Sequence, residues 1–304
     1  MKILIAYDGS DCAKLALTDL RRAGLPREAE AIVLSVADVW ILGSPGNASE
    51  MPAYSEMYKN SWSKERKEAQ QALDEAGALA EEGVKSLKSM FSDWDARAET
   101  ATDSPAWAVI KRADEWHPDL IVVGSHGRSA VGRTVLGSVS QKIVAHARGA
   151  VRVARGRAEA GDRDVRIVIG VDGSAYSDLA VEAVRRRAWP AGTEALVLAA
   201  PELLMGGLVW SEEFDDEQAS ADKIVAAAAE KLREAGLSVS TKVSYGDPKR
   251  VLVDEAEQWG ADAIFVGARG LRAIERFLLG SVSTSVAARA HCSVEVVRNP
   301  PASV

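Results

Sequence analysis

The stretch GSHGRSAVGRTVLGSVS, residues 124–140, occurs a second time as GARGLRAIERFLLGSVS, residues 267–283. In each copy an apolar run leads into the first glycine, a second glycine follows three positions later, and a Gly-Ser pair follows after nine more residues. This order predicts a strand, a loop and the start of a helix. Glycines permit close approach of a ligand, and the amides at a helix N-terminus attract anions. The stretch therefore predicts a phosphate-binding loop that is present twice.

The repeat extends outward to the whole chain. RIVIGVDGS, residues 166–174, repeats ILIAYDGS, residues 3–10, at a spacing of 172 − 8 = 164 between the aspartates. The glycine loops repeat at a spacing of 267 − 124 = 143, so the second copy is 164 − 143 = 21 residues shorter. The charged stretch GRAEAGDRD, residues 156–164, interrupts the pattern and is typical of a linker. We therefore predict two domains, residues 1–155 and 165–304, joined by a linker at 156–164.

The extra length of the first copy falls within about residues 38–90. Its early part is rich in glycine and proline and predicts a loop, whereas residues 61–89 predict a long amphipathic helix. Two interpretations stay open. The segment is either a surface extension or, through its aromatic residues Trp40, Tyr54, Tyr58 and Trp62, a lid or an interaction surface.

The order of the remaining elements predicts the fold class. A short apolar strand, a helix and a second buried strand form a βαβ unit, which requires a parallel sheet. Each half continues to five strands, expected near residues 3–7, 30–36, 95–101, 120–123 and 151–154 in the first half. In the second half the last three are expected near residues 238–244, 263–266 and 293–297. The prediction is an α/β protein made of two five-stranded parallel α/β sandwiches in tandem.

Composition excludes several functional classes. A net charge of −7 and a pI near 5.3 argue against nucleic acid as the partner. The two cysteines form neither a disulfide framework nor a metal motif, and the four histidines are scattered, so no metal site is expected. The apolar N-terminal run is too short for a signal peptide or a membrane span, which leads us to expect a cytoplasmic protein.

Asp8 and Asp172 follow the first strand of each half, at the sheet edge where open parallel sheets bind ligands. A carboxylate repels phosphate, so in a nucleotide site we expect it to accept hydrogen bonds from the nucleoside. The alternative is a cap on the following helix, and the two roles are compatible. Arg128 in the first loop is a candidate phosphate clamp or a solvated loop charge.

The glycine pattern is neither a Walker A sequence nor GxGxxG after the first strand, and no catalytic set repeats in both halves. His126 aligns with Arg269, so a shared general base at that position is not expected. These features favour holding a nucleotide over splitting it.

With Asp-Gly-Ser after the first strand, Gly-x2-Gly-x9-Gly-Ser after the fourth and a terminal fifth strand in both halves, the chain resembles a tandem universal stress protein over nearly its whole length. The resemblance implies Rossmann-like winding, ATP as ligand with Mg²⁺ accompanying the phosphates, and pairing of the two domains through their last strands. It places adenosine at Asp8 and the backbone near Val36, with Asp172 and Ala200 as counterparts. Ribose and phosphates would contact Gly124, Gly127, Gly137, Ser138, Val139 and Ser140, or Gly267, Gly270, Gly280, Ser281, Val282 and Ser283.

The chain departs from the family pattern in two places. Ala150 and Ser293 stand where many members have a proline before the fifth strand, and no proline ends the first strand. We expect an ATP-binding protein that senses or stores nucleotide in a stress response and changes its partners accordingly, with a homo-oligomer as a possible assembly. The alternatives are a nucleotide-free interaction module and a slow ATPase.

Overall fold

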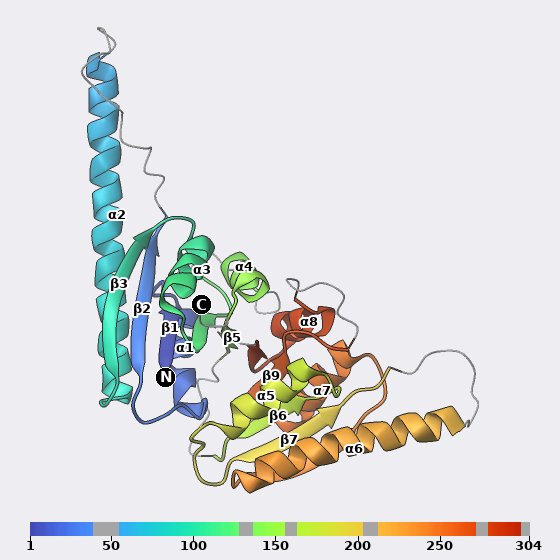
Figure 1. Cartoon of the computed structure of the whole chain (residues 1–304). Helices are drawn as coiled ribbons and strands as arrows, with labels where there is room; N and C mark the ends of the chain where they lie inside the picture. The colour runs from blue at the N-terminus through green and yellow to red at the C-terminus, as the bar shows by residue number, and fades with distance from the viewer. Residues whose placement is uncertain (39–54, 128–135, 156–162, 203–211, 272–278, 299–304) are drawn as a thin grey trace.

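A computed structural model of the chain describes residues 1–38, 55–127, 136–155, 163–202, 212–271 and 279–298 (Figure 1). The first half contains β1 (Lys2–Ala6), α1 (Asp11–Asp19), a short 3₁₀ turn (Leu20–Arg22), β2 (Glu30–Ala37), α2 (Ser55–Met90), β3 (Asp95–Thr102), α3 (Pro105–Trp116), β4 (Leu120–Gly124), α4 (Ser138–His146) and β5 (Ala150–Ala154). The second half contains β6 (Arg166–Gly170), α5 (Ala175–Arg185), β7 (Glu194–Ala199), α6 (Glu212–Glu234), β8 (Ser238–Val243), α7 (Pro248–Trp259), β9 (Ala263–Gly267), α8 (Ser281–Arg289) and β10 (Ser293–Val297).

All ten of these strands form one sheet, in the order β3-β2-β1-β4-β5-β10-β9-β6-β7-β8. Within each half the neighbouring strands are parallel, and the order of the first half reverses direction between β1 and β4. The second half has the same order, with its reversal between β6 and β9. The one antiparallel pair is β5 with β10, where the two halves meet. The predicted α/β class and the two five-stranded parallel halves are confirmed.

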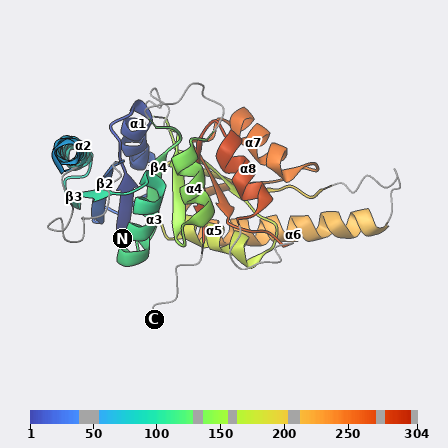
Figure 2. The same cartoon turned by 90° about the horizontal axis from the view of Figure 1, so that it is seen from above.

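The helices cover both faces of the sheet. Under α3, α4, α7 and α8 lies one apolar core that runs across both halves, and α4 lies beside α8 at the junction in both views (Figures 1 and 2). On the opposite face the core under α1 and α2 is separate from the core under α5 and α6. The two halves thus share one apolar core on one face of the sheet and have separate cores on the other face.

The longest helix, α2, begins at Ser55, six residues before the predicted start, and Figure 1 shows it running well past the sheet. Its counterpart α6 was not predicted. Because α2 has 36 residues and α6 has 23, most of the 21-residue difference between the halves is helix length rather than a separate insertion. The predicted role of Trp40 and Tyr54, and most of the predicted linker, fall on residues outside the described part.

The C-terminal part of α2 is tied to the first strand through Tyr7. The Tyr7 hydroxyl donates to Glu82 Oε1 at 3.1 Å, and a Cβ placed on Gly83 would lie 2.8 Å from Val33 Cγ1. Tyr7 is 2% exposed, and burial, followed by the hydrogen bond and charge of Glu82, raises its pKa to about 12. The close packing at Gly83 and the buried hydroxyl fix α2 on the sheet.

None of the helices within the described ranges has both the length and the apolar content needed to cross a membrane.

Candidate functional site

Each half carries a candidate site at the carboxyl ends of its own parallel strands, where its strand order reverses. Asp8 follows β1 and Gly124 ends β4, and these two strands are hydrogen-bonded neighbours. Asp172 and Gly267 have the same relationship at β6 and β9. Open α/β sheets bind ligands between two such strands, from which the chain adds further strands in opposite directions.

Each aspartate joins the first helix to the glycine loop. Asp8 Oδ1 accepts a hydrogen bond from the Ser10 amide at 3.0 Å, and Asp172 Oδ1 accepts one from the Ser174 amide at 3.0 Å. The side chains that cap α1 and α5 are those of Ser10 and Ser174, at Ala13 N and Ser177 N. The aspartate therefore shapes the turn before the helix and leaves the capping to the serine.

The second oxygen of each aspartate faces the loop. A Cβ placed on Gly127 would lie 3.0 Å from Asp8 Oδ2, and one placed on Gly270 would lie 2.5 Å from Asp172 Oδ2. In the second half the Leu271 amide donates to Asp172 Oδ2 at 3.2 Å. A side chain at the second glycine of the pattern would therefore crowd this carboxylate, more closely in the second half than in the first.

The Gly-Ser pairs form helix starts with no side-chain cap. Gly137 and Gly280 are the N-cap residues of α4 and α8, both in extended conformation and with no capping hydrogen bond from a side chain. Their own amides donate 2.8 Å hydrogen bonds to the carbonyls of Ser125 and Ala268. The amides of the first helical turn, which begins at Ser138 and Ser281, lack intrahelical acceptors. Both loops thus present a helix N-terminus able to receive an anion.

Ser138 and Ser281 are exposed at this terminus, and Val139 is 36% exposed. Ser140 and Ser283 point inward instead. The Ser140 hydroxyl donates to the Gly124 carbonyl at 2.6 Å, and Ser283 Oγ lies 3.0 Å from the carbonyl oxygens of Ala268 and Gly280. The inner serines close the loop onto the end of the strand. Their predicted contact with ligand stays a prediction, since a hydroxyl oxygen that donates can also accept.

The first glycine of each pattern has a packing role that the sequence did not reveal. A Cβ on Gly124 would lie 3.1 Å from the carbonyl carbon and oxygen of Cys12 in α1. The corresponding Cβ on Gly267 would lie 2.5 Å from those atoms of Tyr176 in α5. These glycines allow the first helix of each half to approach the fourth strand closely.

Val36 is the next-to-last residue of β2, and Ala200 directly follows β7. The amides of Tyr7 and Val171 donate to the carbonyls of Leu34 and Leu198, so Val36 and Ala200 lie at the same sheet edge as the aspartates. Val282 follows Ser281 in the first turn of α8. Arg128, together with the rest of 128–135 and 272–278, lies outside the described residues.

The two sites differ in their side chains. In the first half Ser125 Oγ lies 3.8 Å from Cys12 Sγ and 3.1 Å from His126 Nδ1. The corresponding positions of the second half hold Tyr176, Ala268 and Arg269, and the Arg269 guanidinium lies 5.6 Å from the centre of the Tyr176 ring. The first site therefore carries a thiol, a hydroxyl and an imidazole where the second carries a phenol ring, an alanine and a guanidinium group.

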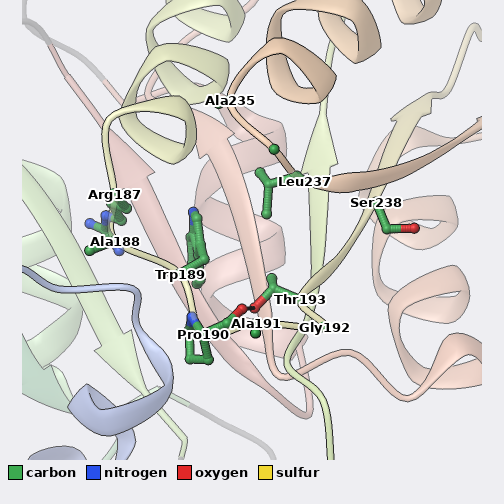
Figure 3. A pocket seen from close by; sticks show the side chains of 11 residues that line it. Arg187, Ala188, Trp189, Pro190, Ala191, Gly192, Thr193, Ala235, Leu237 and Ser238 are labelled. Carbon is green, nitrogen blue, oxygen red and sulfur yellow. Dashed lines mark hydrogen bonds between the residues drawn. The ribbon is translucent and has the colours of Figure 1, made fainter.

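A cavity of about 360 Å³ lies at the amino-terminal ends of β7 and β8 in the second half (Figure 3). Thr193 precedes β7, Leu237 precedes β8, and both line it together with Trp189. This is the amino-terminal edge of the parallel strands, so the cavity is not the candidate site. Within the described ranges, no three His, Cys, Asp or Glu side chains gather as metal ligands would.

Comparison with known proteins finds the same family by sequence and by structure. A sequence model of the universal stress protein family matches the chain twice, over residues 1–155 and 165–298. A universal stress protein of Mycolicibacterium smegmatis is 31% identical over 184 residues, and the match covers 59% of this chain and 61% of the length of that relative. One of Mycobacterium tuberculosis is 27% identical over 237 residues, covering 76% of this chain and 77% of that protein.

Among solved structures, a universal stress protein from Archaeoglobus fulgidus aligns with a TM-score of 0.59 at 18% identity, over 99% of this chain and 97% of that one. At this identity the likeness shows a shared fold.

Proposed function

Because the chain belongs to the universal stress protein family, we propose that each of its halves binds one adenine nucleotide, ATP with Mg²⁺, at the carboxyl edge of its sheet. In this proposal nucleotide occupancy sets how the protein interacts with its partners in a stress response. We also propose that the β5–β10 pair holds the two halves together in solution.

The observation that carries the proposal is the pairing of an uncapped helix start with a carboxylate at the strand reversal, once in each half. The N-cap residues of α4 and α8 are Gly137 and Gly280, and a Cβ there would lie 3.3 Å from the Ser125 carbonyl oxygen or 3.1 Å from that of Ala268. Amides and the helix dipole favour phosphate there. Asp8 and Asp172 are suited to accept hydrogen bonds from ribose hydroxyls or the base.

The same residues favour holding a nucleotide over splitting it. The Ser125 and His126 side chains of the first loop have Ala268 and Arg269 as counterparts in the second half, so no general base on the loops themselves repeats. In our proposal Mg²⁺ is held through phosphate oxygens, because this ion keeps several waters and is commonly bound through substrate phosphates.

A nucleotide-free interaction module is the second candidate. The observation that favours it is α2, whose 36 residues extend past the sheet (Figure 1). Under this alternative the glycine loops serve only as turns, and the function resides in the helix and its partners.

One experiment separates the candidates. The purified full chain is denatured, the released small molecules are identified by chromatography, and the emptied protein is titrated calorimetrically with ATP, ADP and AMP, each with and without Mg²⁺. We expect two equivalents of ATP per chain, with affinity falling as phosphates are removed. Finding no adenine nucleotide and no uptake of ATP with Mg²⁺ would rule out the nucleotide proposal and favour the interaction module. Steady phosphate release that is lost in the Gly137→Asp, Gly280→Asp double variant would instead identify a slow ATPase.

A further inference from the structure

The junction between the halves has an approximate two-fold axis, and its centre is occupied by two different charged residues. The last strands repeat at a spacing of 295 − 152 = 143 residues, so Arg152 and Glu295 are equivalent positions. They also face each other in the antiparallel ladder, between the pairs Val153–Val294 and Val151–Val296. The axis therefore passes through Arg152 and Glu295.

These two residues belong to a buried chain of alternating charges. Arg152 Nε donates to Asp19 Oδ2 at 2.7 Å, and Arg152 Nη1 lies 3.4 Å from Glu295 Oε2. Arg187 Nη2 donates to Glu295 Oε1. The Arg152 side chain is fully buried and that of Glu295 is 1% exposed. Burial lowers the pKa of Arg152, but the charges of Asp19 and Glu295 hold it above its ordinary value.

A pair of like halves would lose this arrangement. Two first halves joined through β5 would place Arg152 opposite Arg152, and two second halves joined through β10 would place Glu295 opposite Glu295. Each charge would keep only the counterion of its own half, Asp19 for Arg152 and Arg187 for Glu295, and a like charge would replace its partner across the buried axis, which is unfavourable. Two first halves would also lack Ser293, whose hydroxyl donates to Asp19 Oδ1 at 2.7 Å, because Ala150 is its equivalent.

A second contact, away from the axis, discriminates by shape. Gly24 has φ +62°, and a Cβ placed on it would lie 2.6 Å from Trp189 Cδ2 in the other half. The Ala188 amide donates to the Gly24 carbonyl at 2.9 Å. Since 188 − 24 = 164, Ala188 is the counterpart of Gly24, and Leu25 is the counterpart of Trp189. In a pair of second halves each Trp189 would meet an alanine where it now meets a glycine.

Two arginine contacts at the junction are the same in both directions. Arg155 Nη2 donates to the Ala287 carbonyl in α8 at 2.6 Å, and its equivalent Arg298 donates to the Val144 carbonyl in α4. These two equivalent hydrogen bonds would also form in a pair of like halves. They contribute to association but cannot tell one half from the other.

We propose that the Arg152–Glu295 pair and the Gly24–Trp189 contact make the pairing of the two halves selective. Together they favour β5 beside β10 and disfavour β5 beside a second β5 or β10 beside a second β10. The partner that this surface accepts is a second half opposite a first half, and a second copy of the chain cannot use it through like halves.

The test starts from the folded full chain with a protease site placed in the linker at 156–162. After cleavage the two halves are diluted, reconcentrated and examined by native mass spectrometry, which separates the pairs by mass. We expect complexes of one first half with one second half only. Pairs of first halves or of second halves in statistical proportion would overturn the proposal.

Two variants of the cleaved protein test the contribution of the Arg152–Glu295 charge pair. Glu295→Arg places a second arginine at the axis, as two first halves would, and leaves Arg187 beside it, whereas Glu295→Gln has a similar size to glutamate without the charge. We expect E295R to weaken the complex at least about 30-fold, and E295Q to weaken it clearly less. Equal losses in the two variants would show that only packing matters at position 295 and would overturn the proposal. If E295R fails to assemble while E295Q remains a complex, the proposal is supported by the same comparison.

Discussion

Asp172 reaches from the end of β6 to the second glycine loop, where its Oδ2 accepts a hydrogen bond from the Leu271 amide at 3.2 Å. Its Oδ1 is held by the Ser174 amide at 3.0 Å. Both carboxylate oxygens are therefore engaged before any ligand arrives. The aspartate sets the position of the loop relative to the first helix, and a ligand at this edge meets a carboxylate that is already oriented.

Gly270→Ala should disturb the second site more than Gly127→Ala disturbs the first. The new Cβ would lie 2.5 Å from Asp172 Oδ2 in one case and 3.0 Å from Asp8 Oδ2 in the other, so Asp172 must rotate away and release Leu271. We expect the affinity of the second site for ATP with Mg²⁺ to fall at least about tenfold, a loss of about 1.4 kcal/mol. Calorimetric titration measures this, with the unaltered site of each variant as the internal control. Unchanged affinity at both sites in G270A would contradict the role given to this carboxylate.

Gly137→Asp and Gly280→Asp should each remove one equivalent of ATP from the titration. The substitution places bulk and negative charge at the N-cap of α4 or α8, where phosphate is proposed to lie. Aspartate is a favourable N-cap residue, but its Cβ would lie 3.3 Å from the Ser125 carbonyl oxygen or 3.1 Å from that of Ala268, so we expect a small loss of stability. Thermal unfolding of the nucleotide-free variants checks that point. If either single variant still binds two equivalents, the site is wrongly assigned.

Gly24→Ala should destabilise the chain more than Gly260→Ala. Both glycines have positive φ, +62° and +69°, and a side chain there costs about 1–2 kcal/mol. Only at Gly24 would the methyl group also meet a neighbour, Trp189, which adds about 1–3 kcal/mol of overpacking. Urea unfolding of the two variants measures the difference. Equal losses would mean that Trp189 moves aside without cost.

Tyr7 should make the stability of the chain fall between about pH 10 and pH 12. Its folded-state pKa is raised to about 12 from an ordinary value of 10.0, so the neutral hydroxyl stabilises the fold fully below pH 10, and this contribution is lost as the pH rises through 12. The shift corresponds to about 2–3 kcal/mol. Tyr7→Phe removes this particular dependence, and the difference between the two proteins cancels the other groups that titrate in the range. Parallel curves of unfolding free energy against pH for the two proteins would contradict the assignment.

The strands and the class of fold could be predicted from the sequence because buried parallel strands are continuous apolar runs, as in LIVV before Gly124 and AIFV before Gly267. Helix α6 could not, since much of its buried face consists of alanines such as Ala221, Ala228 and Ala229. Alanine gives a weak periodic signal in a segment otherwise rich in charge. The position of α2 in the repeat would have indicated a helix there.

The site residues were predicted as a group, but their separate roles were not. Gly124 and Gly127 both exclude a Cβ, one because of the Cys12 backbone and the other because of Asp8, and a pattern of glycines does not distinguish a neighbour from a ligand. The charge pair at the junction was hidden for another reason. A single Arg152 or Glu295 within a short apolar strand gives no indication of burial until the strand that covers it is known.

The single core beneath α3, α4, α7 and α8 has a thermodynamic consequence. Residues from both halves, such as Val151 and Val294, contribute to it, so neither half can expose its share without uncovering the other. The chain should therefore melt in one cooperative step rather than as two independent domains. A nucleotide bound to either half would then raise the melting temperature of both, because ligand binding free energy is added to one shared transition.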